Sequence, residues 1–129
     1  MIVDTSAWIH FLQNSHIAIA DRVEDALAEG AAVTGTIVME LLAGARSEKQ
    51  LADLEQLLGR ATLVATEPED FESAALLYRR CRQNGVTIRT MSDCLIAATA
   101  IRNGLPILHN DRDFALLAHY TDLQVIDPF

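Results

Sequence analysis

The chain opens with MIVDTSAWIHFL (residues 1–12), a short apolar run that ends at an acid and turns directly into a helix-like segment. Ile2, Val3 and Asp4 together have the length of a strand, and the run from Ala7 to Leu12 resembles a short helix. Strands that turn directly into helices are typical of parallel sheets covered by helices. The carboxyl ends of such strands line the crevice where ligands bind. This stretch therefore predicts an α/β fold and makes Asp4 a candidate functional residue.

The alternation of strand-like and helix-like segments continues to the end of the chain. Apolar runs of strand length predict four further strands, at 32–34, 63–65, 107–109 and 123–126. Amphipathic or wholly apolar segments of helical length predict helices at 17–29, 37–43, 48–58, 68–84, 94–101 and 112–119. The fold class is therefore α/β, with a parallel sheet of about five strands packed against helices.

The totals set limits on size and location. With 129 residues, 50% of them hydrophobic, the chain has material for one domain, residues 1–129, and too little for two. Cys81 and Cys94 lie in helical runs where a small buried side chain fits, as in a reduced protein. We find neither an export signal nor an apolar run long enough to span a membrane. We therefore expect a soluble, cytoplasmic protein with no membrane contact.

The net charge of −8 argues against the basic surface that is typical of nucleic-acid binders. Two bound divalent cations would halve that charge if some of the acids are metal ligands. Residues 73–92 contain no acid but four arginines, Arg79, Arg80, Arg82 and Arg89. The first three have a structural explanation, because they complement the dipole of a helix C-terminus. The alternative is that Arg79, Arg82 and Arg89 contact backbone phosphates of a nucleic acid.

Three further acids stand at similar turns. Asp111 repeats the arrangement of Asp4, because it follows the predicted strand at 107–109 and precedes a helix. Asp113 lies two residues further on, where it either joins the same site or complements the first turn of that helix. Asp93 occupies the first turn of the apolar helix near the centre of the chain. Each of these acids, like Asp4, is explained equally well on its own by a role at a helix N-terminus.

Glu40 has no such explanation. It lies inside the apolar run from Ile37 to Ala43, without a turn nearby and with no basic residue closer than Arg46. We expect it to be buried, and burying an unpaired carboxylate is costly. It should therefore either reach a distant arginine or coordinate a cation, and we favour the cation.

The chemistry of these side chains indicates a hard metal ion. Carboxylate oxygens without histidine or cysteine select Mg²⁺ or Mn²⁺ over zinc, and the four histidines show no metal-ligand spacing. Divalent ions held by carboxylates suit the hydrolysis of phosphodiester bonds. We therefore expect metal ligands that also serve as the catalytic residues, namely Asp4, Glu40, Asp93 and Asp111.

Four motifs carry a resemblance to a known family. They are MIVDTS (1–6), ELLAG (40–44), SDCLIAA (92–98) and HNDRDF (109–114). In this order and at this spacing they resemble the PIN-domain ribonucleases, in particular the VapC-type toxins of bacterial and archaeal toxin–antitoxin pairs. The resemblance runs from one end of the chain to the other.

This resemblance implies a three-layer α/β/α sandwich in which the four acids form one pocket. It implies that Asp4 and Asp93 are the principal ligands and that Ser6 is an accessory polar group. It leaves Asp111 and Asp113 in competition for the fourth acidic position, and the number of metal ions open. It further implies an RNA substrate, a homodimer and a cognate antitoxin that blocks the pocket.

Three rival interpretations are weaker. A phospho-acceptor receiver domain needs a lysine late in the chain, and the only lysine is Lys49. An aspartyl phosphatase needs a second acid two residues after Asp4, where Ser6 stands. A PIN-like module that binds RNA or protein without catalysis is the more serious alternative, and the presence of all four acids argues against it.

Overall fold

A five-stranded sheet forms the centre of the computed structural model, which describes residues 1–126. The strands are β1 (Ile2–Val3), β2 (Ala32–Thr34), β3 (Thr62–Val64), β4 (Ile107–Leu108) and β5 (Val125–Ile126). Their order is β3-β2-β1-β4-β5, and every pair is parallel. The chain thus runs outward from β1 to β3 on one side and then returns to β4 and β5 on the other. This reversal makes the carboxyl ends of β1 and β4 the expected place for a ligand.

Seven helices connect the strands within residues 1–126. They are α1 (Thr5–Gln13), α2 (Ile17–Glu29), α3 (Gly35–Ala43), α4 (Glu48–Leu58), α5 (Pro68–Gln83), α6 (Met91–Arg102) and α7 (Arg112–Tyr120). The side-chain oxygens of Thr34, Ser47 and Thr90 each accept a backbone N–H in the first turn of the helix that follows. These caps satisfy donors that have no partner inside the helix. None of the helices described is both long and apolar enough to cross a membrane.

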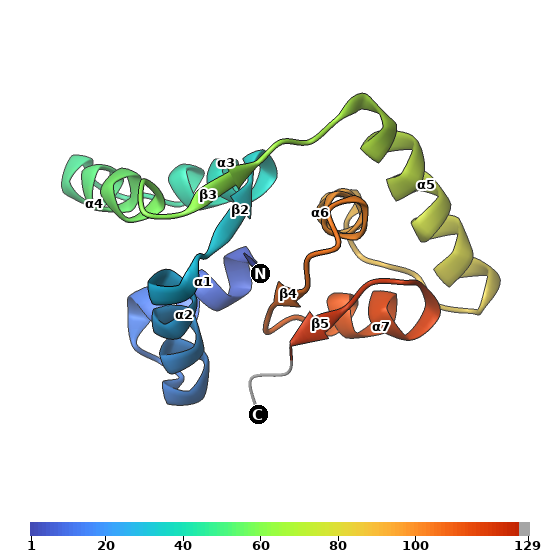
Figure 1. The fold of residues 1–129 in the computed structure, drawn as a ribbon, viewed down its shortest axis with the longest axis horizontal. Coiled ribbons are helices and arrows are strands. Elements are labelled where there is room, and N and C mark those ends of the chain that lie inside the picture. Colours follow the sequence, from blue (N-terminus) through green and yellow to red (C-terminus); the bar gives the residue numbers. More distant parts are fainter. Residues whose placement is uncertain (127–129) are drawn as a thin grey trace.

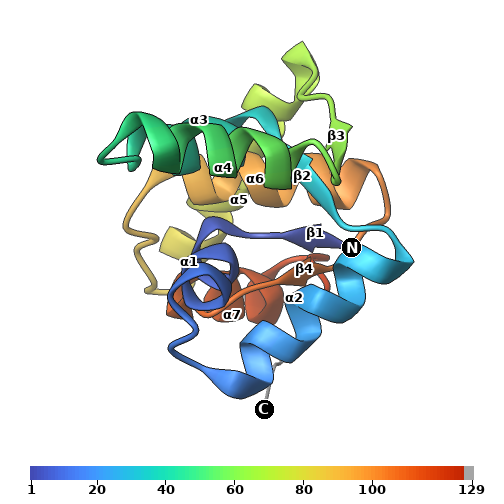
Figure 2. The same cartoon turned by 90° about the vertical axis from the view of Figure 1, so that its left-hand side faces the viewer.

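Helices cover both faces of the sheet. Figure 1 shows the α1–α2 pair on one side of the strands and α5, α6 and α7 on the other. The α3–α4 pair lies beside β2 and β3 in that view and in the perpendicular view of Figure 2. The predicted α/β/α sandwich is therefore confirmed.

The hydrophobic core is built around the two central strands and α6. All four residues of β1 and β4 are fully buried, as are the large side chains of Trp8 and Phe114. Helix α6 buries Cys94 and the run 96–100, because α3, α5 and α7 all contact it. Cys81 is buried as well, and neither cysteine forms a disulfide, as the sequence indicates.

The boundaries differ from the prediction at a few places. Helix α6 begins at Met91, three residues before the predicted start, because the Thr90 side chain caps it. Strand β3 begins one residue earlier than predicted, and its Leu63 is 62% exposed at the edge of the sheet. Strand β5 is two residues shorter than predicted at its start.

Candidate active site at the carboxyl edge of the sheet

The turn after β1 positions Asp4. This residue is 4% exposed, and its Oδ2 accepts the Ser6 backbone N–H at 3.0 Å and the Ser6 hydroxyl at 2.6 Å. The Ser6 Oγ in turn accepts the backbone N–H of Asn110 at 2.9 Å. Asp4 donates its own N–H to the carbonyl oxygen of Leu108 at 3.0 Å. Asp4 is thus the N-cap of α1, as its structural alternative requires, and it is also tied to the turn that follows β4.

The turn after β4 carries two acids that share one arginine. Asp111 Oδ1 accepts hydrogen bonds from the Asp113 backbone N–H at 2.9 Å and from Arg89 Nη2 at 2.8 Å. Asp113 Oδ2 accepts both the Arg89 backbone N–H, at 3.1 Å, and Arg89 Nε, at 3.0 Å. The Asp113 side chain is only 2% exposed, whereas that of Asp111 is 25% exposed. Asp113 is therefore enclosed and fully engaged, while Asp111 keeps an open side.

Asp93 joins these two acids from the first turn of α6. Its backbone N–H donates to Thr90 Oγ1 at 3.4 Å, and a hydrogen bond with the Thr90 side chain opposes the rise in the pKa of its carboxyl group. Carboxylate oxygens of Asp93, Asp111 and Asp113 lie within 4.8 Å of one another, and we call these three residues the acidic cluster. Burial raises the pKa of Asp93 to about 7, and the negative charges of Asp111 and Asp4 add to the shift.

Electrostatics link Asp4 to this cluster. Burial raises the pKa of Asp4, the hydrogen bonds from Ser6 oppose that rise, and the charge of Asp111 adds to it. The same charges act in the other direction, since Asp4 contributes to the raised pKa of Asp93. The candidate site therefore consists of Asp4 together with the acidic cluster, at the carboxyl ends of β1 and β4.

The prediction that Glu40 is buried is wrong. Helix α3 turns Ile37 and Leu41 into the core, which leaves Met39 and Glu40 on its exposed face. The partner of the Glu40 carboxylate is the Thr5 hydroxyl, at 3.4 Å, rather than a distant arginine. This bond holds the carboxyl group beside the β1 turn, where desolvation and the Asp4 charge both raise its pKa. Glu40 thus stands at the rim of the candidate site and not inside it.

The donor atoms of the site fit a hard divalent cation. Oxygen is the only donor type in the acidic cluster, which favours Mg²⁺ or Mn²⁺ over softer metals. The neighbouring thiol of Cys94 is no competitor, since burial raises its pKa to about 12 and keeps it protonated. Burial, together with repulsion from Asp111 and Asp4, raises the pKa of Asp93 to about 7, and a bound cation would offset this cost of ionising the carboxyl group.

Comparison with known proteins identifies the family. The sequence profile of the PIN domain matches residues 1–120. The chain belongs to the PIN-domain family. This PIN domain is 40% identical over 128 residues to VapC ribonuclease Mb1587 of Mycobacterium bovis and to ribonuclease VapC11 of Mycobacterium tuberculosis, with 96% of each chain covered. Ribonuclease VapC51 of Mycobacterium tuberculosis is 32% identical over 102 residues, 78% of this chain and 74% of that protein. Within the family, the chain groups with the VapC ribonucleases.

Solved structures agree with this PIN fold. A chain of the DNA-bound VapBC from Salmonella typhimurium superimposes with a TM-score of 0.80 at 20% identity, covering 99% of this PIN domain and 97% of that chain. A chain of VapBC2 from Rickettsia felis, bound to a promoter DNA fragment, gives a TM-score of 0.79 at 17% identity, covering 97% and 96%. At these identities the likeness concerns the fold.

The arginines of residues 73–92 separate into two groups. Arg80 and Arg82 lie in the last turn of α5, as the helix-dipole explanation predicts, and the Arg82 guanidinium lies 5.6 Å from the centre of the Tyr78 ring. Arg79 is exposed on the same helix. Arg89 differs, because its guanidinium already binds two acids of the site. A contact of Arg79 or Arg82 with RNA stays a prediction.

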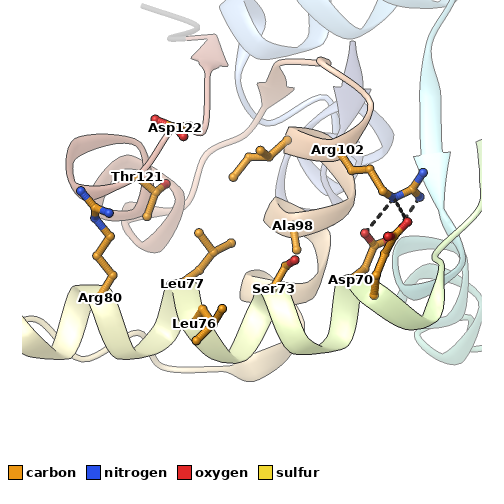
Figure 3. A pocket seen from close by; sticks show the side chains of 11 residues that line it. Asp70, Ser73, Leu76, Leu77, Arg80, Ala98, Arg102, Thr121 and Asp122 are labelled. Atoms are coloured by element: carbon orange, nitrogen blue, oxygen red, sulfur yellow. Dashed lines mark hydrogen bonds and ion pairs between the residues drawn. The ribbon is translucent and has the colours of Figure 1, made fainter.

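A separate groove of about 390 Å³ lies between α5, the C-terminal half of α6 and residues 121–122 (Figure 3). Leu76, Leu77 and Ile101 form its apolar part. At one end Arg102 forms a two-pronged ion pair with the buried Asp70. The groove is at the ends of α6 and α7 opposite to Asp93 and Asp111, so it is not part of the candidate site.

Proposed function

We propose that this PIN domain is the ribonuclease toxin of a toxin–antitoxin pair and that it hydrolyses RNA with divalent cations held by Asp4, Asp93 and Asp111, with Glu40 assisting from the rim of the site. Mg²⁺ is the ion we propose, and Mn²⁺ a working substitute. The supporting observation is the convergence of buried and half-buried, mutually repelling carboxylates at one sheet edge, in a chain 40% identical to VapC ribonucleases. Asp113 and Ser6 are accessory residues in this proposal.

The protein's own contribution is to hold the acids in place. A bound divalent cation supplies the means to activate water and to stabilise the charge that develops on phosphate oxygens. Ser6 fixes the orientation of Asp4, because its hydroxyl joins Asp4 to the Asn110 backbone. Asp93 has to lose its proton before it serves as a ligand, and near neutral pH its raised pKa makes that loss a competition between proton and metal.

The partners we propose are RNA and a cognate antitoxin, with the toxin itself a homodimer in the cytoplasm. The structural neighbours from Salmonella typhimurium and Rickettsia felis are VapBC complexes bound to DNA, which supports an antitoxin partner for this chain as well. The curated relatives are named ribonucleases, which supports RNA as the substrate. Light scattering of the isolated protein tests the homodimer.

The test is an RNA cleavage assay on the full chain, purified free of antitoxin. We expect cleavage with Mg²⁺ or Mn²⁺, none with a chelator, and losses of at least about 100-fold for Asp4→Asn and Asp93→Asn. Asp21→Asn, an exposed acid on α2, is the matched control and should cleave like the parent. If Asp4→Asn and Asp93→Asn cleave as fast as the parent, the proposed site is wrong. Binding of RNA without any metal-dependent product would favour the non-catalytic module.

A further inference from the structure

Arg89 is the one cation that the structure brings onto the acidic cluster within residues 1–126. Arg89 lies in the segment between α5 and α6, four positions before Asp93. Its guanidinium spans two acids: Nη2 is 2.8 Å from Asp111 Oδ1 and Nε is 3.0 Å from Asp113 Oδ2. The backbone N–H of Arg89 adds a third bond to Asp113 at 3.1 Å. The arginine thus joins the segment that leads to Asp93 with the turn that carries the other two acids.

Charge explains why this contact forms. The oxygens of Asp93, Asp111 and Asp113 lie within 4.8 Å of one another, so the three carboxylates repel unless a cation lies among them. Asp113 is almost completely enclosed, and an enclosed carboxylate requires a partner. Arg89 supplies that partner with its backbone N–H and its Nε, and its Nη2 reaches Asp111; the Arg89 side chain as a whole is 64% exposed.

A divalent metal ion and the guanidinium need the same negative charge. Asp111 is the acid of the pair with an open side, and its Oδ1 is the atom that Arg89 holds. A carboxylate has lone pairs for both cations, yet the two cations repel each other at this range. Occupancy by one therefore lowers the affinity for the other.

We propose that Arg89 is the internal counter-cation of the acidic cluster, which holds Asp111 and Asp113 in the metal-free protein and competes with the divalent cation for them. This inference rests on the proposed metal site and adds a positioning residue to it. It differs from the prediction made from the sequence, in which Arg89 contacts RNA phosphates. Arg89 could compete with the metal, orient the metal ligands or contact RNA phosphates. Without RNA, removal of Arg89 would then give tighter, weaker or unchanged metal binding, respectively.

The experiment measures Mn²⁺ affinity of the full chain, free of antitoxin and RNA, from the paramagnetic resonance signal of unbound Mn²⁺. We expect Arg89→Ala to bind Mn²⁺ roughly tenfold more tightly than the parent, the order expected when a unit charge beside a divalent cation is removed. Arg89→Lys retains the charge and should return the affinity toward that of the parent. Arg60→Ala removes the same charge from the exposed turn before β3, at the opposite edge of the sheet, and should leave the affinity unchanged.

Weaker Mn²⁺ binding by Arg89→Ala would overturn the proposal, because it would mean that the arginine orients the ligands rather than competing with the metal. Unchanged binding with a raised KM for RNA would overturn it in favour of a phosphate contact. Arg89→Gln keeps a hydrogen-bond donor for Asp113, so it replaces Arg89→Ala if circular dichroism shows that the alanine variant is unfolded. Failure of the metal site itself is recognised separately: the parent would then bind no Mn²⁺, or Asp93→Asn would bind it equally well.

Discussion

The hydroxyl of Ser6 donates a hydrogen bond of 2.6 Å to Asp4 Oδ2, and the backbone N–H of Ser6 donates to the same oxygen at 3.0 Å. Both bonds hold the Asp4 carboxylate in one orientation. Ser6, two positions after the proposed metal ligand Asp4, thus acts as its orienting group. Loss of such an outer partner typically costs about 10- to 100-fold in metal affinity or activity.

Ser6→Ala should lower Mn²⁺ affinity and cleavage rate by about 10- to 100-fold, because the Asp4 carboxylate and the Asn110 turn lose their common partner. Calorimetric titration with Mn²⁺ measures the first effect and a single-turnover assay the second. Ser73→Ala is the control, because Ser73 lies in the separate groove and not at the candidate site; its Mn²⁺ affinity and cleavage rate should equal those of the parent. A Ser6→Ala protein with parental affinity would show that Asp4 needs no orienting group.

Asp111 and Asp113 should respond differently to the loss of charge. Asp111→Asn removes the acid with an open side, so we expect Mn²⁺ affinity to fall at least about tenfold with little change in stability. Asp113→Asn removes the charge from an enclosed carboxylate that holds Arg89 twice, so the free energy of unfolding should fall by about 1–3 kcal/mol. Chemical denaturation measures the free energy of unfolding of both variants, and Mn²⁺ titration measures their metal affinity. The reverse pattern would make Asp113 the fourth ligand.

The stability of the metal-free protein should depend on Asp93. Its pKa is raised from 3.8 to about 7 by folding, so the folded state binds the proton more tightly than the unfolded state does. The stability contributed by this group is therefore present at low pH and is lost as the pH rises from about 4 to 7. We expect Asp93→Asn to gain stability relative to the parent between pH 5 and pH 8 in chelator. Parallel pH profiles of melting temperature for the two proteins would contradict this.

The Asp70–Arg102 pair should matter for folding and not for metal binding. Asp70 is 1% exposed, and it accepts bonds from Arg102 Nε at 2.8 Å, Arg102 Nη2 at 3.1 Å and Thr99 Oγ1 at 3.2 Å. The hydrogen bonds from Arg102 are the main cause of its lowered pKa. The contribution of Asp70 to stability is therefore present above pH 3.8, the ordinary value, and is lost as the pH falls below it through the lowered pKa.

Asp70→Asn should therefore lower the free energy of unfolding by about 3 kcal/mol while Mn²⁺ affinity stays at the parental value. Asp53→Asn breaks only the exposed pair with Lys49 and should change stability by less than about 1 kcal/mol. Denaturant titrations give both values. A loss of Mn²⁺ affinity in a folded Asp70→Asn protein would connect the groove to the acidic site, against the separation described above.

Local sequence signals predicted the elements well where they were strong. Helices α2 and α4 have the predicted ends, because an amphipathic stripe defines the first and Ser47 caps the second. Asp4 and Asp111 were predicted at one edge because parallel strands bring their carboxyl ends together. Asp93 was predicted as a ligand together with them, although its position in a helix start has an ordinary structural explanation.

The predictions failed where the position of a side chain depends on tertiary packing. The composition around Glu40 is apolar on all sides, so the sequence does not reveal that α3 leaves one of its faces exposed. The role of Arg89 was missed because its partners follow 22 and 24 residues later, beyond the reach of any helical spacing. The only local sign was the absence of acids around the arginine, which also fits a phosphate contact.

The central claim is that RNA cleavage requires a divalent cation bound by the acidic cluster and Asp4. Its most direct test is to titrate Mn²⁺ into antitoxin-free protein while recording both metal occupancy and the single-turnover rate of RNA cleavage, for the parent and for Asp93→Asn. We predict that rate and occupancy rise together in the parent and that Asp93→Asn loses both. Cleavage that persists in chelator, or an Asp93→Asn protein that cleaves at the parental rate, would contradict the account.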